Sequence, residues 1–405
     1  MTTNIRILDA EEELVAAANV FRAAMIGFPP LPKLTAEQMA VLFEPERTLG
    51  AFVDGQLAGT VDAGTSRLTL PGGALVGHAA VTHIGVLPSF TRRGIATALV
   101  RHQLNDCATR GEVVATLRAS EATIYERYGY GVASSSRSVE VKTALAALRP
   151  GVASGGPVCL LDPAKTWAVL PGICVRNRPA RPGTIDRTPA WWQSARLRAE
   201  ATPGPAYVAV YGEPGSESGF ARYRPIQTER WFVSDDRTIV VEDFFAPSTE
   251  AYLGLIRFLL GLDLVDRVMF WSMPVDDPLP GLLVDRRAAK VTAVYDETWL
   301  RIVDVPRALA ERRYASDDAV VIAVDDPMLQ RNSGAFVVSS DGAEPTDSAG
   351  QIHVGVAGLG AVLLGGTTWR ELALAGLAST DDPAALTAAD RLFAVPQAPH
   401  AGFFF

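Results

Sequence analysis

The sequence predicts an α+β protein made of several domains. At 405 residues the chain is long enough for two to four domains of roughly 150 residues each. Strand-like and helix-like patterns alternate up to about residue 145, and a second such series follows a loop-like stretch at 149–157. The composition, 48% hydrophobic and 20% charged, is that of a globular protein with enough apolar surface for several cores.

The first segment is expected to form a mixed, mostly antiparallel sheet flanked by helices. Its clearest turn is the dipeptide Asp54-Gly55, which is favoured in hairpins and separates strands at 50–53 and 57–63. The other elements expected are strands at 5–8, 79–86, 113–117 and 138–141 and helices at 10–24, 94–109 and 121–128.

A second strand–helix series follows the loop at 149–157 and repeats the order of the first segment without an Arg-Gly loop. Its expected elements are strands at 207–211, 238–244 and 267–271 and helices around Trp191-Trp192 and at 248–260. A third segment is expected to hold strands at 299–303, 319–324, 334–339 and 351–354 and helices at 369–375 and 383–391. We therefore expect domains over 1–148, 149–289 and 290–405, the second being a degenerate copy of the first without a cofactor site.

Charge, cysteine content and hydropathy exclude several functional classes. The formal net charge of −8 and the pI of about 5.3 are opposite to the basic surface that nucleic-acid binding requires. The apolar run at 253–264 is too short for a membrane span and contains Arg257 and Asp263. The three cysteines have no metal-ligand spacing and are interpreted as reduced, buried thiols. With no signal-peptide core at the N-terminus, we expect a cytoplasmic protein that holds no metal, binds no nucleic acid and has no membrane span.

A strand, a tight turn and a helix between residues 81 and 100 form the strongest local signal. A helix N-terminus exposes unpaired N–H groups and a partial positive charge, which together attract phosphate. Gly94 permits a close approach of backbone and phosphate, and Arg92 and Arg93 add two cationic side chains. The alternative is a glycine turn with two solvated arginines. The strand, short helix and aromatic-Gly-aromatic turn that follow at 117–130 favour the phosphate-binding interpretation.

The chain ends in three aromatic residues, Phe403, Phe404 and Phe405. A surface tail of this composition would be poorly soluble and frayed, so we expect the terminus to be buried. Desolvation raises the pKa of an α-carboxylate above its ordinary value of about 3.5, which makes this carboxylate a candidate base. The alternative is that Phe405 fills a hydrophobic groove and leaves its carboxylate in water.

The motifs Thr91-Arg92-Arg93-Gly94-Ile95-Ala96 and Ile124-Tyr125-Glu126-Arg127-Tyr128-Gly129-Tyr130-Gly131 resemble those of the GCN5-related N-acetyltransferases. Over essentially its whole length the chain resembles the enhanced intracellular survival (Eis) branch of actinobacterial acetyltransferases. The late run Val362-Leu363-Leu364-Gly365-Gly366, then Asp390-Arg391-Leu392-Phe393 and a terminal Phe, is similar to that branch. The resemblance implies an N-terminal acetyltransferase domain, an inactive second domain of the same fold, a C-terminal domain like sterol carrier protein 2, and a homohexamer.

The resemblance also implies roles for individual residues. Tyr125 matches the family's general acid and the carboxylate of Phe405 its general base, with acetyl-CoA as co-substrate and no metal. The residues that match the family's coenzyme contacts are Ile84, Gly85 and Val86 for the pantetheine arm, Arg92, Arg93, Gly94, Ile95, Ala96 and Thr97 for the pyrophosphate, and Ser120 and Glu121 as a further contact. Taken alone, Tyr125 is interpreted as a half-buried helix aromatic.

Three features differ from the family. Thr91 stands where the general pattern has Gln or Arg, and Phe404 stands where mycobacterial members have an acidic residue. Their acidic amine pocket near the first helix is replaced here by the apolar run Ala24-Met25-Ile26-Gly27-Phe28.

The main hypothesis is an acetyl-CoA-dependent N-acetyltransferase that acts by direct attack of a primary amine, on an aminoglycoside, a polyamine or a peptide lysine. One alternative is a protein that binds an apolar, lipid-like or sterol-like ligand in its third domain and has a vestigial first domain. Another is an acyltransferase that prefers longer acyl chains. His83 is interpreted as a packed histidine of the cofactor strand, and the run at 358–363 lacks the third glycine of a dinucleotide fingerprint.

Overall fold

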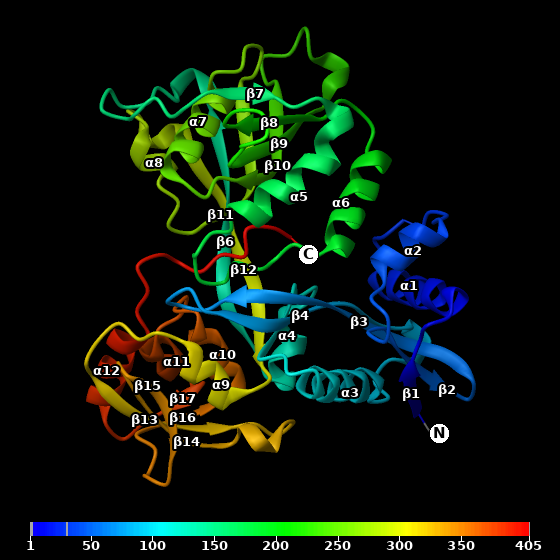
Figure 1. The fold of residues 1–405 in the computed structure, drawn as a ribbon, viewed down its shortest axis with the longest axis vertical. Helices are drawn as coiled ribbons and strands as arrows, with labels where there is room; N and C mark the ends of the chain where they lie inside the picture. Colours follow the sequence, from blue (N-terminus) through cyan, green and yellow to red (C-terminus); the bar gives the residue numbers. More distant parts are fainter. Residues whose placement is uncertain (1–2, 30, 405) are drawn as a thin grey trace.

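The computed structural model describes residues 3–29 and 31–404, and the chain forms two β-sheets (Figure 1). The larger sheet has twelve strands in the order β1-β2-β3-β4-β5-β12-β6-β11-β10-β9-β8-β7. The smaller sheet has five strands in the order β15-β14-β13-β16-β17. Helices flank both halves of the large sheet, and the C-terminal tail runs back from the small sheet to the region between the two halves (Figure 1).

The first half of the large sheet follows the predicted alternation of strands and helices. Its strands pair antiparallel except β4 and β5, which are parallel and joined by α3. The predicted hairpin turns at Asp54 and Gly55, whose φ angles of 50° and 84° suit a turn with two left-handed residues. Helix α2, which begins with a capping box at Thr35, was not predicted. The bounds are β1 Thr3–Ile7, α1 Glu11–Met25, α2 Ala36–Leu42, β2 Leu49–Val53, β3 Gln56–Thr69, β4 Leu75–Val86, α3 Ile95–Thr109, β5 Val114–Leu117, α4 Ala122–Tyr125 and β6 Tyr130–Lys142.

The second half repeats the central unit of the first. β10 and β11 are parallel and joined by α7, just as β4 and β5 are joined by α3. The predicted strands and the long helix of this segment are all present, which confirms a second domain of the same fold. The bounds are β7 Val158–Leu160, α5 Thr166–Arg176, α6 Pro189–Ala201, β8 Tyr207–Tyr211, β9 Gly219–Ile226, β10 Thr238–Phe245, α7 Thr249–Leu260, β11 Arg267–Pro274 and α8 Leu279–Leu282.

Two long strands, β6 and β12 (Ala289–Ile302), join the halves. β6 pairs antiparallel with β11 along one edge and with β12 along the other, and β12 also pairs with β5. The strand expected at 299–303 in the third segment therefore belongs to the large sheet. It covers the edge of β5 that would otherwise expose unpaired backbone groups. The domain limits at 148 and 289 remain a prediction.

The small sheet and its helices form the third unit, and α10 packs against β6 and β12. Gly131 of β6 lies so close to the carbonyl oxygen of Ala357 that a Cβ there would come within 2.0 Å of it, so only glycine fits. Arg301 of β12 donates to both carboxylate oxygens of Asp326 at 2.7 and 2.8 Å, and both side chains are fully buried. The bounds are α9 Val305–Glu311, β13 Ala319–Asp325, β14 Gly334–Ser339, β15 Gly342–Thr346, β16 Ile352–Gly355, α10 Val356–Leu363, α11 Trp369–Leu374, β17 Ala378–Ser379 and α12 Pro383–Phe393.

The structure can be compared with two expectations from the sequence, the burial of the cysteines and the lack of a membrane-spanning helix. Cys107 is buried and Cys174 is partly buried, but Cys159 is exposed because it lies on the edge strand β7, so the expectation of three buried thiols is wrong for that residue. Among the described residues no helix is long and apolar enough to cross a membrane. Within the same residues no group of three or more His, Cys, Asp or Glu side chains could hold a metal ion.

Candidate active site

The parallel strands β4 and β5 diverge after a short paired stretch. They pair only where His78–Ala80 lie beside Val114–Thr116, and β4 then shifts register against β3 near His83. Beyond this shift, Gly85 and Val86 pair with β3 on one edge, and no strand of the described chain pairs with the other edge. The backbone around them is therefore free to pair with an amide-bearing chain.

The loop between β4 and α3 has the geometry of an anion site. Gly94 is the N-cap of α3 with a φ of 78°, and Arg92 has a φ of 62°, so the turn depends on two left-handed residues. Arg92, Arg93 and Gly94 are exposed, and the guanidinium of Arg93 lies over the ring of Phe90 at 5.1 Å. The first N–H groups of α3, from Ile95 onward, point out of the helix end beside these cations.

The segment after β5 carries the other predicted residues of the first half. Ser120 and Glu121 are exposed, and Glu121 is the N-cap of α4. Tyr125, the last residue of α4, is 6% exposed and packs edge-on against Tyr130 with ring centroids 6.1 Å apart. Burial raises the pKa of Tyr125 above its ordinary value, although a hydrogen bond with the side chain of Ser120 opposes the shift. The hydroxyl is therefore protonated at neutral pH.

Residues from all three predicted groups of the first half meet at one hydrophobic cluster. Ile95 and Tyr125 are part of it, and Ile84 and Val86 pack against it. The start of α3 approaches the segment after α4 directly, because the hydroxyl of Thr97 lies 3.4 Å from that of Tyr128. The structure thus brings the three predicted groups of the first half, at 84–86, 92–97 and 120–125, to one end of β4 and β5.

The C-terminal tail is fixed along its length where the two halves of the large sheet meet (Figure 1). Its backbone forms hydrogen bonds with five residues of other segments. These bonds are His400 N–H to Pro182 O at 2.9 Å, Ala401 N–H to Glu297 Oε2 at 3.1 Å, Arg187 to Gly402 O at 3.2 Å, Trp191 Nε1–H to Phe404 O at 2.6 Å, and Arg118 to Phe403 O. Phe403 is buried, as expected, but Phe404 is 72% exposed, so the expectation of a buried aromatic terminus is wrong for that residue. Phe405, to which we assigned the general base, lies outside the described residues.

Glu297 of β12 is the centre of the tail's anchoring. Its carboxylate, 2% exposed, accepts a hydrogen bond from Ser134 at 2.7 Å and lies 3.0 Å from Nδ1 of His400 and 3.5 Å from Arg118. Burial by itself raises the pKa of Glu297, but the charges of His400 and Arg118 outweigh it and hold the pKa below its ordinary value. Because Arg118 directly follows β5, this cluster ties the tail to the end of β5, close to Ser120.

Sequence reasoning did not find these anchoring residues. Arg118, Glu297 and His400 are separated from one another by more than a hundred positions, so no local spacing connects them. A buried acid on a strand and an arginine after a strand are recognisable only once the sheet order places β5, β12 and β6 side by side. Trp191, interpreted from the sequence as core or interface, contacts the tail with its ring 4.8 Å from that of Phe403.

His83 lies at the register shift of β4 with a φ of 53°, which is unusual for a residue other than glycine. Its ring packs edge-on against Phe21 of α1 at 4.8 Å, and its Nδ1 lies 3.5 Å from Oδ2 of Asp62. Asp62 is buried and accepts a hydrogen bond from Thr48 at 3.0 Å. The structure therefore gives His83 both the packing expected for it and an acidic neighbour.

The end of α1 is apolar, as its sequence indicated. Ile26 is 85% exposed and Phe28 is 52% exposed, and the ring of Phe28 lies 5.3 Å from that of Phe21. Phe21 in turn contacts His83, so this apolar surface adjoins strand β4.

The chain matches known protein families in both halves of the large sheet and in the third unit. Residues 4–133 and 183–302 each match a family described as an acetyltransferase (GNAT) domain, and residues 305–402 match a sterol carrier protein domain. The crystal structure of Eis1 from Mycobacterium abscessus superimposes with a TM-score of 0.93 at 48% identity and covers all of both chains. N-acetyltransferase Eis of Mycobacterium tuberculosis is 32% identical over 81% of each chain. An uncharacterized N-acetyltransferase of Streptomyces coelicolor is 33% identical over 93% of each chain.

The two repeated halves with diverging parallel strands define an N-acetyltransferase of the GCN5-related class, which confirms the predicted fold class and enzyme class. The acetyltransferase domains imply the use of acetyl-CoA. Within this class, the chain belongs to the Eis family. The interpretation as a lipid-binding protein with a vestigial first domain is not favoured by these relatives.

Proposed function

We propose that this enzyme transfers the acetyl group of acetyl-CoA directly to a primary amine, with Tyr125 as general acid and the carboxylate of Phe405 as general base. The observation that carries the proposal is the docking of the tail. Backbone groups from His400 to Phe404 are held by partners on both halves of the sheet, and Arg118 and Glu297 tie them to the end of β5. Contacts of this kind would hold the terminal carboxylate near the residues to which we assign the reaction.

The coenzyme would lie along the divergence of β4 and β5. Free backbone groups at Ile84, Gly85 and Val86 suit the amides of the pantetheine arm, and the exposed N-terminus of α3 suits the pyrophosphate. Arg92 and Arg93 supply positive charge beside that helix end, which compensates for Thr91 at the position where many relatives have Gln or Arg. Ser120 and Glu121 are exposed at the other side of the site.

The proposed chemistry needs a proton acceptor for the amine and a proton donor for the leaving thiolate. An α-carboxylate of ordinary pKa, about 3.5, is a weak base, and the aromatic environment of Phe403 would raise that pKa. A thiol of pKa about 8.5 leaves readily as thiolate, so donation from Tyr125, whose pKa is raised, assists the reaction to a modest degree. We therefore assign the larger share of catalysis to the terminal carboxylate.

The acceptor is proposed to be a small-molecule or peptide amine: an aminoglycoside, a polyamine or a lysine. Among these three, the apolar surface at Ile26 and Phe28 favours a peptide lysine over the two polycations, the aminoglycoside and the polyamine. The alternative of an acyltransferase that prefers longer acyl chains is tested by comparing turnover with propionyl-CoA and with acetyl-CoA. The homohexamer, the cytoplasmic location and aminoglycoside acetylation remain predictions.

The proposal is tested by the release of free CoA thiol from acetyl-CoA with a panel of amines that includes kanamycin. The intact chain is compared with a chain that ends at Phe404 and with the variant Phe405→Leu, which keeps the carboxylate in place and removes the ring. Turnover that is lost on truncation but retained in Phe405→Leu supports the terminal base. Equal turnover in the truncated chain refutes it. An intact chain that acetylates none of the amines refutes the proposed acceptor class.

A further inference from the structure

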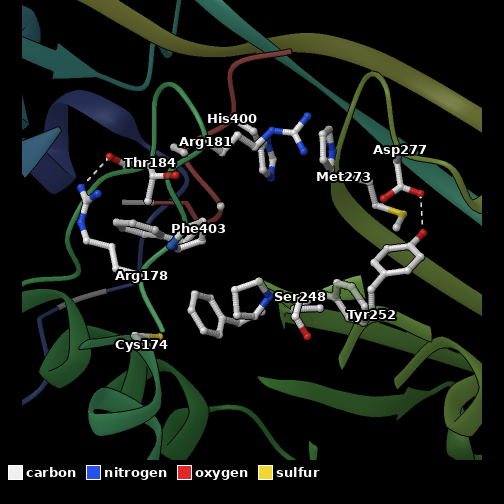
Figure 2. Close-up of a pocket in the computed structure, with 18 of the residues that line it drawn as sticks. Cys174, Arg178, Arg181, Thr184, Ser248, Tyr252, Met273, Asp277, His400 and Phe403 are labelled. Carbon is white, nitrogen blue, oxygen red and sulfur yellow. Dashed lines mark hydrogen bonds between the residues drawn. The ribbon is translucent and has the colours of Figure 1, made fainter. Parts of the chain in front are cut away.

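A cavity of about 920 Å³ lies mainly among residues of the second half of the molecule. Figure 2 shows Tyr252, Asp277 and Met273 on one side of it and Phe403 and Arg178 on the opposite side. Its volume is at the upper end of the range of small-molecule sites. Because Gly402 and Phe403 also line it, the C-terminal tail forms part of its wall.

This cavity occupies the same place in the second half that the coenzyme site is proposed to occupy in the first. β10 and β11 pair in parallel only from Thr238–Val241 to Arg267–Phe270, and both strands continue beyond that stretch. β10 shifts register after Val241, as β4 does near His83. A short turn then connects β10 to α7. Phe245 at the end of β10 and Met273 near the end of β11 both line the cavity, which therefore lies between the diverging strands.

The helix end beside this cavity is unsuited to a phosphate. The turn before α7 contains Pro247, which lacks an N–H, and the hydroxyl of Ser248 already accepts the N–H of Ala251 at 3.1 Å. Glu250 adds a negative charge in the first turn of α7. The arginines and the glycine that precede α3 have no counterparts here. A coenzyme with a pyrophosphate would therefore bind this half poorly.

Each arginine that lines the cavity is already held in an ion pair. Arg187 donates to both carboxylate oxygens of Asp243 at 2.6 and 2.8 Å, and Arg178 and Arg67 are both paired with Asp186. Arg181, a further lining residue, is paired with an aspartate outside the cavity. A charged ligand would have to lose its hydration and compete with these aspartates for the arginines, so the cavity favours an uncharged one.

Polar groups on the cavity wall remain able to bind an uncharged ligand. The hydroxyl of Tyr252 donates to Oδ1 of Asp277 at 2.7 Å, and the same oxygen accepts the N–H of Leu279 at 2.9 Å. Burial raises the pKa of Asp277 above its ordinary value, and its carboxyl oxygens can accept hydrogen bonds from a ligand amide or hydroxyl. The inner edges of β10 and β11 beyond their paired stretch add backbone groups of the kind that hold an amide chain.

We infer that this cavity binds an uncharged, elongated chain that carries amide and hydroxyl groups, of the chemical class of pantetheine without its nucleotide. Diverging strands provide the backbone partners, and Phe245 and Met273 provide apolar contact. The Tyr252–Asp277 pair provides a polar end. An occupant would touch Phe403 and so contact the tail that leads to the proposed general base.

The test is isothermal titration of the full chain with S-ethyl pantetheine, a probe that has neither phosphate nor free thiol, after saturation with CoA to fill the first half. We expect binding of one probe per chain, and binding at least about tenfold weaker for the 4′-phosphorylated probe, because each lining arginine is already paired with an aspartate. Met273→Trp, which places a bulkier side chain on the cavity wall between the diverging strands, should weaken binding. Val233→Trp, at a position 76% exposed and outside the cavity, should leave it unchanged.

The heat of CoA binding reports separately on the first half and on the folding of each variant. If Met273→Trp does not bind CoA, Tyr252→Phe replaces it, and its affinity for the probe should fall about fivefold, as the loss of one hydrogen bond predicts. No probe binding to the CoA-saturated wild-type chain, or unchanged affinity in both variants, overturns the inference. Probe binding without CoA binding would support this cavity while refuting the coenzyme site proposed for the first half.

Discussion

Replacing Glu297 with Gln should release the C-terminal tail and slow turnover. The carboxylate of Glu297 is almost fully buried between Arg118 and His400 and also accepts the backbone N–H of Ala401. Removing one partner of a buried ion pair costs roughly 3–5 kcal/mol, because the remaining charge is left uncompensated. Glutamine keeps the shape and can still accept from Ser134, so we take the lower limit of about 3 kcal/mol.

At about 1.4 kcal/mol per factor of ten, that loss lowers the docked fraction of the tail, and with it kcat, by up to about 100-fold. The KM for acetyl-CoA should change little, because the loop at Arg92 and Gly94 lies on another element than the residues that anchor the tail. Initial rates of thiol release give kcat and KM. The rate at which carboxypeptidase removes the terminal phenylalanines reports on tail docking directly.

The matched control is Glu344→Gln, at an exposed position of β15 in the small sheet. It removes the same charge without touching the tail and should leave kcat and digestion unchanged. If Glu297→Gln retains wild-type kcat while its tail is digested faster, the terminal carboxylate is not the base. If neither quantity changes, Glu297 does not anchor the tail.

Three further outcomes follow from burial and charge. Tyr125→Phe should lower kcat about tenfold, measured by thiol release, because the general acid assists a leaving group that is already good. Burial lowers the pKa of His78 to about 3, so the folded ring stays neutral while an unfolded histidine binds a proton below about pH 6.5. Stability should therefore fall by roughly 2 kcal/mol from pH 6.5 to 5, and His78→Leu should flatten this slope in urea unfolding measured across the same range. Asp326→Ala should lower the free energy of unfolding by roughly 3–5 kcal/mol in urea, since it leaves Arg301 buried without its counter-charge, and exposed Asp341→Ala should change it little.

Local signals in the sequence were sufficient for most elements of the large sheet. The Asp54-Gly55 turn fixed the β2–β3 hairpin, and the turn before Ile95 fixed the start of α3, because both depend on backbone conformations that few residues adopt. The run at 358–363 was recognised only as a failed dinucleotide fingerprint, whereas it lies in helix α10. α10 is buried on almost all sides, so it lacks the alternation of apolar and polar residues that reveals a helix.

The candidate site shows the same contrast between local and long-range information. The residues at 84–86, 92–97 and 120–125 were proposed from single short motifs, and their roles remain predictions. The exposure of Cys159 and the pairing of Trp299 with β5 could not be predicted, because both depend on strand order. Strand order is set by contacts between residues far apart in the chain, which leave no periodic pattern in either partner.

The sequence by itself determined the kind of protein, with two acetyltransferase-like units, and it predicted a phosphate-binding loop at Gly94 and a role for the aromatic terminus. Only the tertiary structure decided how the terminus is held. Glu297, Arg118 and His400 meet because β12 lies between β5 and β6, and burial then makes their charges interact strongly. The cavity beside the tail has the same origin, since it exists only where β10 and β11 diverge and the chain's end closes the space between them.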